Sequence, residues 1–496
     1  MTLHLSILLF VPLAFGVLAL LLPPAVATRV ACIGALLTAL YSLAFLVDFD
    51  SSSGTLQYVT DETWIAELGI SYKLGLDGLN LFLVVLTGIL WFACTLWAAQ
   101  RDYDKPRLFF FHVGLAETSV LGALLAQDLA LFVVFFDLML VPFFFLTGIW
   151  GGARRVQATM KLVIYTLVGS LLMLTAAIAT GVLAASGAPA LSFAFSDLAQ
   201  RPLEHASQYW IFLFFTAAFL VKMPAFPLHG WMPDAYRNMP LPALALFSAV
   251  LSKVAAYGFL RICLPLFPDA TTHFQTVLLL LALASILYGS AMAFTTTEVR
   301  LILGYSSVAQ LGFITLGIFA LNAQGAQGAI LQAFNHGLVV APAFLIVALL
   351  AERAGGSEDI RDMGGIGMRA PLLATMFLIV TFATLAMPGS SNFVGEFLIL
   401  LGAFKSKLAI ALVASTGVVL ASVYALRMFI VTVHNRTGPR VESRELSLRD
   451  GIVVVPLVLA ILAIALYPQF ALTRSEATVS GEAAPSALAA EGGSGP

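Results

Sequence analysis

The chain alternates long apolar runs with short polar stretches from one end to the other. A run of about 20 apolar residues forms an α-helix long enough to cross a hydrocarbon core of about 30 Å. The runs are continuous rather than alternating, which argues against a membrane β-barrel. The pattern predicts fourteen membrane-spanning helices, numbered here in chain order, at residues 3–22, 29–48, 76–98, 107–125, 128–150, 159–185, 208–223, 240–264, 273–294, 301–320, 327–350, 371–402, 409–433 and 450–468.

Composition supports an all-α polytopic membrane protein in contact with lipids. Hydrophobic residues account for 60% of the 496 residues and charged residues for 10%, whereas a soluble domain carries about 25% charged residues. The net charge of −2 indicates no nucleic-acid partner. The chain has no CxxC pair, no GxGxxG after a strand and no GxxxxGK[ST] motif, so we expect no metal, cluster or nucleotide site in it. Energy must then come from an ion gradient or a partner protein.

Lysine and arginine are concentrated in one set of predicted loops. That set holds 17 of the 25 basic residues and the opposite set holds 6; the two left over, Lys222 and Lys253, fall within spans. Because cytoplasmic loops carry the excess of positive charge, we expect the richer set to face the cytoplasm and both termini to face away from it. The first apolar run has no preceding lysine or arginine and is as long as a full span, which favours a retained helix over a cleaved signal peptide.

The predicted spans divide the chain into five parts. Residues 1–106 hold helices 1–3 and an acidic outer loop at 49–75. Residues 107–264 and 273–433 are expected to form two inverted five-helix repeats, helices 4–8 and 9–13. Residues 434–474 hold a cytoplasmic loop and the last helix, with no further long helix expected after residue 468. The tail at 475–496 is rich in Ala, Gly, Ser and Pro, and we expect it to be disordered.

Six ionisable side chains within the predicted spans are singled out, because a charge there costs about 2.5–3.5 kcal/mol on insertion scales. Such residues are paired, hydrated or functional, and we regard all six as candidates for ion movement. They are Glu117, Asp137, Lys222, Lys253, His336 and Glu396.

Each candidate also has a structural explanation. Asp137 and Lys253 can serve as fixed counter-ions, and Glu117 can pair with a base in this chain or in an adjacent subunit. Glu396 can be an acid near a helix start, where the helix dipole favours it. His336 can be an ordinary hydrogen-bonded core histidine, although its side chain titrates near neutral pH.

Two spans are interrupted in the same way. "VKMPAFPLHGWMP" and "LAMPGSSNFVGEF" each place Met-Pro inside an apolar run close to an ionisable residue. Pro224 and Pro388 remove a backbone donor, and the freed groups need protein or water to satisfy them. Paired interruptions in two halves of a chain indicate inverted repeats and an ion path near the membrane midplane. After the first break, His229 and Asp234 are expected to organise the loop.

The chain resembles the antiporter-like subunits of respiratory complex I over nearly its whole length. The motifs that carry the resemblance are "ETSVLGALLAQDLALFVVFFDLMLVPFFFLTGIWG", "VKMPAFPLHGWMPDAY", "LSKVAAYGFLR", "YSSVAQLGF", "FNHGL" and "MPGSSNFVGEF". The resemblance implies a proton-translocating membrane-arm subunit of NADH-quinone oxidoreductase in a bacterial inner (plasma) membrane. It implies no cofactor in this chain, with NADH, FMN, iron–sulfur clusters and quinone in partner subunits. The expected neighbours are other membrane subunits of the complex, especially two sister antiporter-like subunits.

The resemblance also implies a role for each candidate. Asp137 on helix 5 would pair with Lys222 on broken helix 7, and Lys253 on helix 8 would be the central proton carrier. His336 would continue the polar chain, and Glu396 on helix 12 would connect it to the outer side.

Glu117 corresponds to an additional acid on helix 4. The sister branches usually carry lysine at the position of Glu396, so the glutamate separates this chain from them.

Three residues depart from the family pattern. Asp137 stands where the family usually has glutamate and is one methylene shorter, so a bridging water is the alternative to direct contact with Lys222. Gln310 stands where the family often has histidine; it can orient water but cannot take up a proton. Tyr236 replaces the second histidine of the motif after the first break. Both central lysines remain, so we do not infer an inactive channel.

Two other functions remain open. The chain can instead be a subunit of a multisubunit sodium/proton antiporter or of a membrane-bound hydrogenase, which share the fold. It can also be a scaffold that holds a membrane arm together without conducting protons. The acid on helix 12 and the full motif set favour complex I, and the buried charges argue against a scaffold.

Overall fold

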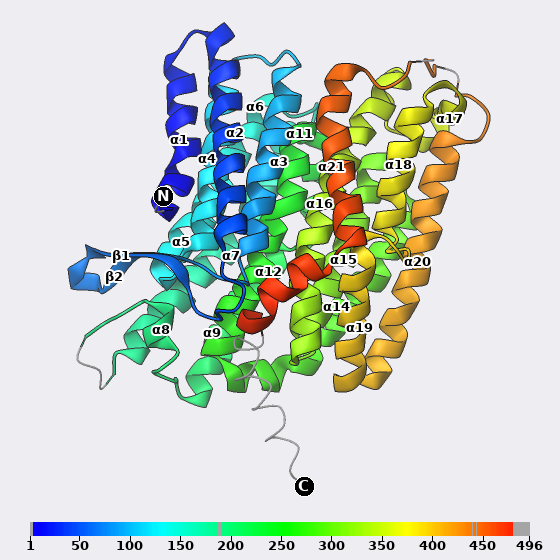
Figure 1. Ribbon diagram of the computed structural model, residues 1–496. Helices are drawn as coiled ribbons and strands as arrows, with labels where there is room; N and C mark the ends of the chain where they lie inside the picture. The colour runs from blue at the N-terminus through cyan, green and yellow to red at the C-terminus, as the bar shows by residue number, and fades with distance from the viewer. Residues whose placement is uncertain (1–2, 187–189, 439, 443, 480–496) are drawn as a thin grey trace.

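Helices dominate the fold because an apolar backbone in lipid must satisfy its own hydrogen bonds. The computed structural model describes residues 3–186, 190–438, 440–442 and 444–479, and most helices in this part of the chain run side by side along one axis (Figure 1). Eleven helices in this part are long and apolar enough to cross a membrane, and Leu5–Leu21 and Pro371–Thr384 are shorter apolar helices. The chain is therefore a polytopic, predominantly α-helical membrane protein.

The first half of the chain contains one long helix for most predicted spans and several interrupted ones. Its helical segments are α1 (Leu5–Leu21), α2 (Pro24–Asp48), η1 (Ala66–Leu68), α3 (Leu81–Ala99), α4 (Pro106–Leu125), α5 (Leu129–Leu138), α6 (Leu140–Trp150), α7 (Arg155–Ala184), α8 (Phe195–Leu198), α9 (His205–Lys222), α10 (Met232–Asn238), α11 (Leu241–Leu246), η2 (Phe247–Leu251), α12 (Ser252–Gly258), η3 (Phe259–Cys263) and α13 (Leu264–Leu266).

The second half continues the bundle. Its helical segments are α14 (Pro268–Thr295), α15 (Val299–Ile318), α16 (Ala323–Arg353), η4 (Ile360–Asp362), α17 (Ile366–Arg369), α18 (Pro371–Thr384), α19 (Ser391–Ser406), α20 (Leu408–Val433) and α21 (Leu448–Leu466). The helices α15 and α16 lie in the centre of the molecule, since the most apolar windows of both are fully buried.

Both predicted breaks are present. Helix α9 ends at Lys222, just before Pro224, and α18 and α19 are separated by the segment that contains Pro388. The ends of α9 and α18 have the same backbone hydrogen bond to a carbonyl five residues earlier. Ala225 N donates to Leu220 O, and Met387 N donates to Phe382 O. Beyond the first break, Trp231 Nε1 donates to Val221 O at 3.0 Å and satisfies one freed carbonyl.

Two further irregularities were not predicted. The fifth predicted span divides at Met139 into α5 and α6, and Pro142 follows within the first turn of α6. The eighth contains the π-helical segments η2 and η3, one on each side of α12. Such segments insert an extra residue into a helical turn and often occur at functional sites.

The segment at 49–75 is not a loop throughout but contains a two-stranded hairpin, so the all-α prediction is wrong there. Strands β1 (Gln57–Ile65) and β2 (Ile70–Leu76) pair antiparallel, with Thr60 opposite Leu74 and Thr63 opposite Ser71. The sequence of β1, QYVTDETWI, is rich in the β-branched and aromatic residues that favour strands. The third helix therefore begins at Leu81 rather than at residue 76, because β2 extends that far.

The C-terminal prediction is wrong for a few residues. Residues 469–479 are helical, including part of the tail that was expected to be disordered. Figure 1 shows this segment lying obliquely across the lower part of the bundle. The Gly78 backbone N–H donates to Thr478 Oγ1 at 3.2 Å, which ties the segment to the turn before α3. The remaining tail, 480–496, lies outside the described residues.

Candidate functional site

Lys222 occupies the last turn of α9, directly before the proline break. It is only 4% exposed, its Nζ donates to Phe136 O at 3.5 Å, and the ammonium lies 4.7 Å from the centre of the Phe136 ring. The carbonyl and the ring face stabilise the positive charge by hydrogen bonding and by cation–π attraction. Lys222 is thus held against α5, the helix that carries Asp137.

Asp137 lies at the end of α5 next to the interruption at Met139. Its charge interacts electrostatically with Lys222. Within the described residues, however, the two side chains form no ion pair at a nitrogen–oxygen distance of 4.0 Å or less. Asp137 Oδ1 is buried without a hydrogen-bond partner in the protein. The structure therefore brings the two residues close without direct contact.

Lys253 lies at the start of α12 and is completely buried. Its Nζ donates to Ser248 O at 2.6 Å and to Ser252 Oγ at 3.2 Å. The carbonyl acceptor belongs to the π-helical turn η2, so the local irregularity supplies the main partner of the ammonium. Ser248 Oγ is 3.3 Å from Ser307 Oγ, which links Lys253 to the central helix α15.

Glu396 lies in a hydrogen-bonded cluster of three helices. Gln310 Nε2 on α15 donates to Glu396 Oε1 at 2.7 Å, and Gln332 Nε2 on α16 donates to Gln310 Oε1 at 2.8 Å. Gln332 Nε2 also reaches Glu396 Oε1 at 3.4 Å. All three side chains are at most 3% exposed, and we call them the Glu396 cluster.

His336 lies between Lys253 and the Glu396 cluster. It is one helical turn beyond Gln332 on α16, is 3% exposed, and interacts electrostatically with Lys253. Its Nδ1 has no hydrogen-bond partner in the protein. Other buried polar atoms without a protein partner lie on the same helices, at Glu396 Oε2, Gln332 Oε1, Asn335 Oδ1 and Asn392 Nδ2. Groups of this kind are normally hydrogen-bonded to ordered water in folded proteins.

Among the described residues, no hydrogen bond or ion pair joins Glu117 to the other candidates. Glu117 lies on α4 and lines a cavity of about 10 Å³, which has room for about one water. Helices α1, α2 and α3 form the other walls of this cavity. Glu117 Oε1 and Thr95 Oγ1 both line it, and neither has a hydrogen-bond partner in the described part of the protein.

The two polar residues after the first break stabilise the loop. Asp234 accepts a hydrogen bond from Lys161 Nζ at 2.8 Å, which ties α10 to α7. The His229 ring packs against the rings of Phe226 and Tyr288, with centroid distances of 5.8 and 4.7 Å. Both residues therefore fix the course of the chain after Pro224.

Three buried polar residues were not predicted from the sequence: Gln332, Arg261 and Asp77. Gln332 carries no charge, so a search for ionisable residues passed over it, although its spacing of four residues from His336 places both on one face of α16. Arg261, near the end of the predicted span 240–264, was not a candidate, and the structure buries it in η3 as an ion pair with Asp77. The sequence shows the surroundings of Arg261 and Asp77. It does not show that these two residues, which are 184 positions apart, form a pair.

The arrangement suits proton movement rather than bond-breaking chemistry. Titratable side chains alternate with hydroxyl and amide groups that can donate and accept hydrogen bonds. No group of three or more His, Cys, Asp or Glu side chains in the described residues has the geometry of a metal site.

A protein-family model described as NADH:quinone oxidoreductase/Mrp antiporter, TM, matches residues 126–421, from the start of α5 to within α20. The matched segment contains Asp137, both buried lysines, His336 and Glu396, whereas Glu117 lies before it.

Individual relatives extend the similarity to nearly the whole chain. NADH-quinone oxidoreductase subunit M of Rhodobacter capsulatus is 36% identical over 94% of this chain and 93% of the relative. NADH-ubiquinone oxidoreductase chain 4 of Arabidopsis thaliana is 33% identical over 96% of each chain. In three dimensions, a chain of respiratory complex I from Thermus thermophilus with bound NADH superposes with a TM-score of 0.90 at 31% identity, covering 97% of this chain and all of the other.

Proposed function

The chain belongs to the NADH:quinone oxidoreductase/Mrp antiporter transmembrane family, in the branch of NADH-quinone oxidoreductase subunit M and mitochondrial chain 4, and we propose that it is a proton-translocating membrane-arm subunit of NADH-quinone oxidoreductase. Quinone reduction takes place in other subunits and drives proton movement here from a distance. NADH, FMN, iron–sulfur clusters and quinone belong to those partners, and this chain carries no redox cofactor.

The observation that carries the proposal is the series of buried polar groups through the centre of the bundle. Lys253, His336 and the Glu396 cluster are each at most 3% exposed. Several of their polar atoms lack a protein partner, and water molecules at those atoms would complete a hydrogen-bonded path. A proton can move along such a path by exchange between neighbouring groups.

The mechanism begins at the break in α9. A conformational or electrostatic signal changes the interaction between Asp137 and Lys222. The change in charge alters the proton affinity of Lys253, and the proton moves past His336 to the Glu396 cluster and out. Because these sites interact, their titration belongs to the series rather than to single residues.

Pro224 and Pro388 act as hydrated hinges in this mechanism, and His229 and Asp234 hold the loop beside the first hinge. Gln310 orients water or the Glu396 carboxyl without taking up a proton itself. Glu117 is not a member of the main path. It is a separate acid that shares a cavity with Thr95 and a water, against the neighbouring helices.

The membrane topology follows from the helices and the basic loops. We propose fourteen spans, formed by the eleven long apolar helices together with α1, α9 and the pair α18–α19. The matching breaks at Pro224 and Pro388 support two inverted repeats, helices 4–8 and 9–13. The excess of Lys and Arg at one end supports a cytoplasmic location for that end in a bacterial inner membrane, with both termini on the opposite side.

The expected partners are the other membrane subunits of the complex, above all the two sister antiporter-like subunits. A subunit of a sodium/proton antiporter or membrane-bound hydrogenase would share the fold. The relatives that align along nearly all of this chain are nonetheless named as quinone oxidoreductase subunits.

Purification of the tagged full-length chain from its native membrane tests the assignment. We expect NADH-dehydrogenase and quinone-site subunits to co-purify, and vesicles that contain the complex to acidify on addition of NADH and quinone in sodium-free buffer. Recovery of antiporter or hydrogenase subunits instead, or acidification that requires sodium, would overturn it.

A further inference from the structure

A large pocket lies away from the buried polar series, between the start of α18 and the end of α20. Its volume is about 1130 Å³, slightly above the range of about 300–1,000 Å³ that is usual for ligand sites. Both helices are apolar over most of their length, and α18 begins and α20 ends at the pocket. The pocket therefore lies where the membrane interior meets the polar surface.

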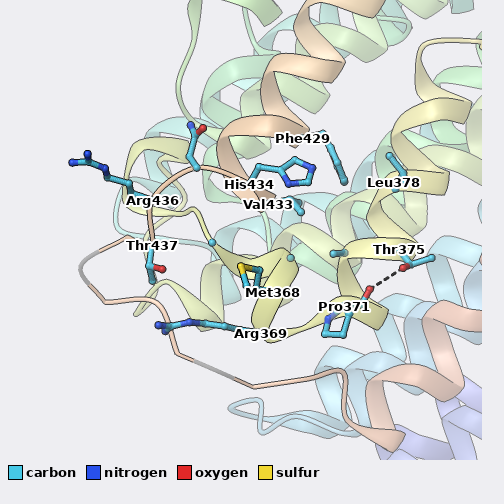
Figure 2. A pocket seen from close by; sticks show the side chains of 14 residues that line it. Met368, Arg369, Pro371, Thr375, Leu378, Phe429, Val433, His434, Arg436 and Thr437 are labelled. Carbon is cyan, nitrogen blue, oxygen red and sulfur yellow. Dashed lines mark hydrogen bonds between the residues drawn. The ribbon is translucent and has the colours of Figure 1, made fainter.

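The pocket has an apolar floor and a basic rim. Ala374, Leu378 and Phe429 form part of the floor, one to two turns inside the helices. Arg369 and Arg436 belong to the rim. Figure 2 shows the two arginine side chains extending toward the same side of the view, with Thr437 between them and Leu378 and Phe429 at the other end of the pocket.

The described lining of the pocket carries basic side chains and no acidic one. On the loop after α20, Glu445 accepts hydrogen bonds from the backbone N–H groups of Leu372 and Leu373 at 2.9 and 3.2 Å and so caps α18. Glu442, in contrast, follows Val441, whose carbonyl accepts from Arg369 Nη1 at 3.3 Å. Asp362 is also engaged, since its Oδ2 accepts from Ser357 Oγ at 2.6 Å. The basic groups of the rim therefore attract an external anion.

The side chains next to the rim suit a membrane surface. Met368, which lines the pocket beside Arg369, is 96% exposed. Figure 2 shows its side chain between His434 and Arg369. A fully exposed apolar side chain among cations is costly in water but favourable where headgroups meet acyl chains.

We propose that this pocket binds an anionic phospholipid. The phosphate lies between Arg369 and Arg436, and the acyl chains lie along Leu378 and Phe429. A soluble anion would use the rim and leave the apolar floor unfilled, whereas a phospholipid matches both. Basic pockets between membrane helices bind anionic headgroups by the same attraction. This inference concerns a site outside the proton path and does not depend on the direction of pumping.

Photo-crosslinking tests the site in the assembled complex. The purified complex is placed in phosphatidylcholine vesicles that contain a minor fraction of phosphatidylglycerol with a photoactivatable acyl chain, and cross-linked peptides are mapped. We expect labelling on residues 371–378 and 429–437, competed by unlabelled phosphatidylglycerol but not by phosphatidylcholine or inorganic phosphate. The double variant Arg369→Gln/Arg436→Gln should lower this labelling about tenfold, since each basic group contributes to the attraction.

The double variant Arg107→Gln/Arg154→Gln is the matched control. It removes the same charge from exposed positions at the starts of α4 and α7, outside the pocket, and it should leave the labelling unchanged. Thr375→Trp, which places a ring in the pocket, should reduce labelling without changing any charge. Equal labelling by a phosphatidylcholine probe, equal labelling in the arginine variant, or no labelling because a neighbouring subunit covers the pocket would overturn the proposal.

Discussion

The Glu396 carboxyl shows how single side chains control this site. One oxygen accepts hydrogen bonds from two glutamines, and the other has no partner in the protein. A buried acid held in this way can exchange a proton with water on its open side, while the amides fix its position. Gln310 therefore stabilises Glu396 without competing for its proton.

Replacement of Gln310 by Leu should disrupt this cluster. Gln310→Leu leaves Glu396 Oε1 and Gln332 Nε2 without their shorter hydrogen bonds, at 2.7 and 2.8 Å. Loss of one buried partner costs about 1–3 kcal/mol. We expect a lower thermal unfolding temperature of the purified complex and slower NADH-driven acidification. Thr315→Val is the control, because Thr315 is buried on the same helix and its hydroxyl donates to Leu311 O within that helix. Equal effects of the two changes would contradict the role of Gln310.

A second prediction concerns the missing methylene at position 137. Asp137→Glu lengthens the acid toward Lys222 and should strengthen their interaction. We expect Lys222→Met to reduce thermal stability more in the Asp137→Glu background than in the original chain, because directly coupled residues show non-additive effects. The four proteins of this cycle are compared by thermal unfolding. An identical cost of Lys222→Met in both backgrounds would show that Asp137 already interacts as strongly as glutamate does.

Ionisable residues in apolar runs could be found from sequence because a charge in a span is rare and costly. Their neutral partners could not, since a glutamine or serine inside a helix carries no such signal. Gln332 and Ser248 became visible only when the helices were placed together. For Glu117, the sequence predicted a position inside a span but not its neighbours. Those neighbours depend on which face of α4 meets α2 and α3.

At the scale of helices, the two breaks have different local causes. Beyond Lys222 the chain turns at Pro224. Before α19 it turns through Ala386 and Gly389, which adopt φ angles of +52° and +91°. Positive φ at Gly389 is accessible to glycine at little cost but is strained for other residues. Pro388 is therefore not the only residue that maintains the second break.

Gly389→Ala should destabilise this break. A Cβ at this position would meet no atom within 4 Å, so the expected cost of about 1–3 kcal/mol comes from backbone strain alone. Gly148→Ala is the matched control, because this residue lies inside α6 and a Cβ there would make only ordinary contacts, at 3.8 Å. It should be neutral or slightly stabilising. Thermal unfolding measures both, and a neutral result for Gly389→Ala would indicate that the break relaxes.

The positions of the helices followed from the apolar runs, and both proline breaks followed from the chemistry of proline. The π-helical turn η2 did not, because "ALFSAVLSKVAAYG" has no proline and is compatible with a regular helix, and η3 did not because Pro265 follows it only at the end of the predicted span. The hairpin of β1 and β2 was also missed. Its acidic residues suggested a loop, while its strand-forming residues become decisive only when both strands pair.

At the scale of the whole molecule, a buried ion pair joins distant parts of the chain. Asp77 precedes α3 and Arg261 lies near the end of the eighth span, and both are at most 5% exposed. Asp77 Oδ1 also accepts from Leu79 N at 2.9 Å. The pair therefore links the N-terminal helices to the first proposed repeat. Residues 469–479 contact the chain next to this pair, where the Gly78 backbone N–H donates to Thr478 Oγ1.

Asp77→Asn should lower the stability of the whole bundle. Removal of the acidic partner from a buried pair costs about 3–5 kcal/mol. Asp61→Asn removes the acid from the 2.9 Å pair with Lys73 on the hairpin, where Asp61 is 48% exposed, and exposed pairs contribute about 0–1 kcal/mol. We expect a clear drop in unfolding temperature for the first change and little for the second. Equal drops would argue against a structural role for the buried pair.

Protons are proposed to pass through this chain by way of Lys253. The most direct test is the proton-pumping rate per NADH oxidised in vesicles that contain the fully assembled complex with Lys253→Met, compared with Lys405→Met at the exposed end of α19. We expect Lys253→Met to lower this ratio and Lys405→Met to leave it at the level of the original complex. An unchanged ratio in a fully assembled Lys253→Met complex would show that protons do not pass by way of Lys253.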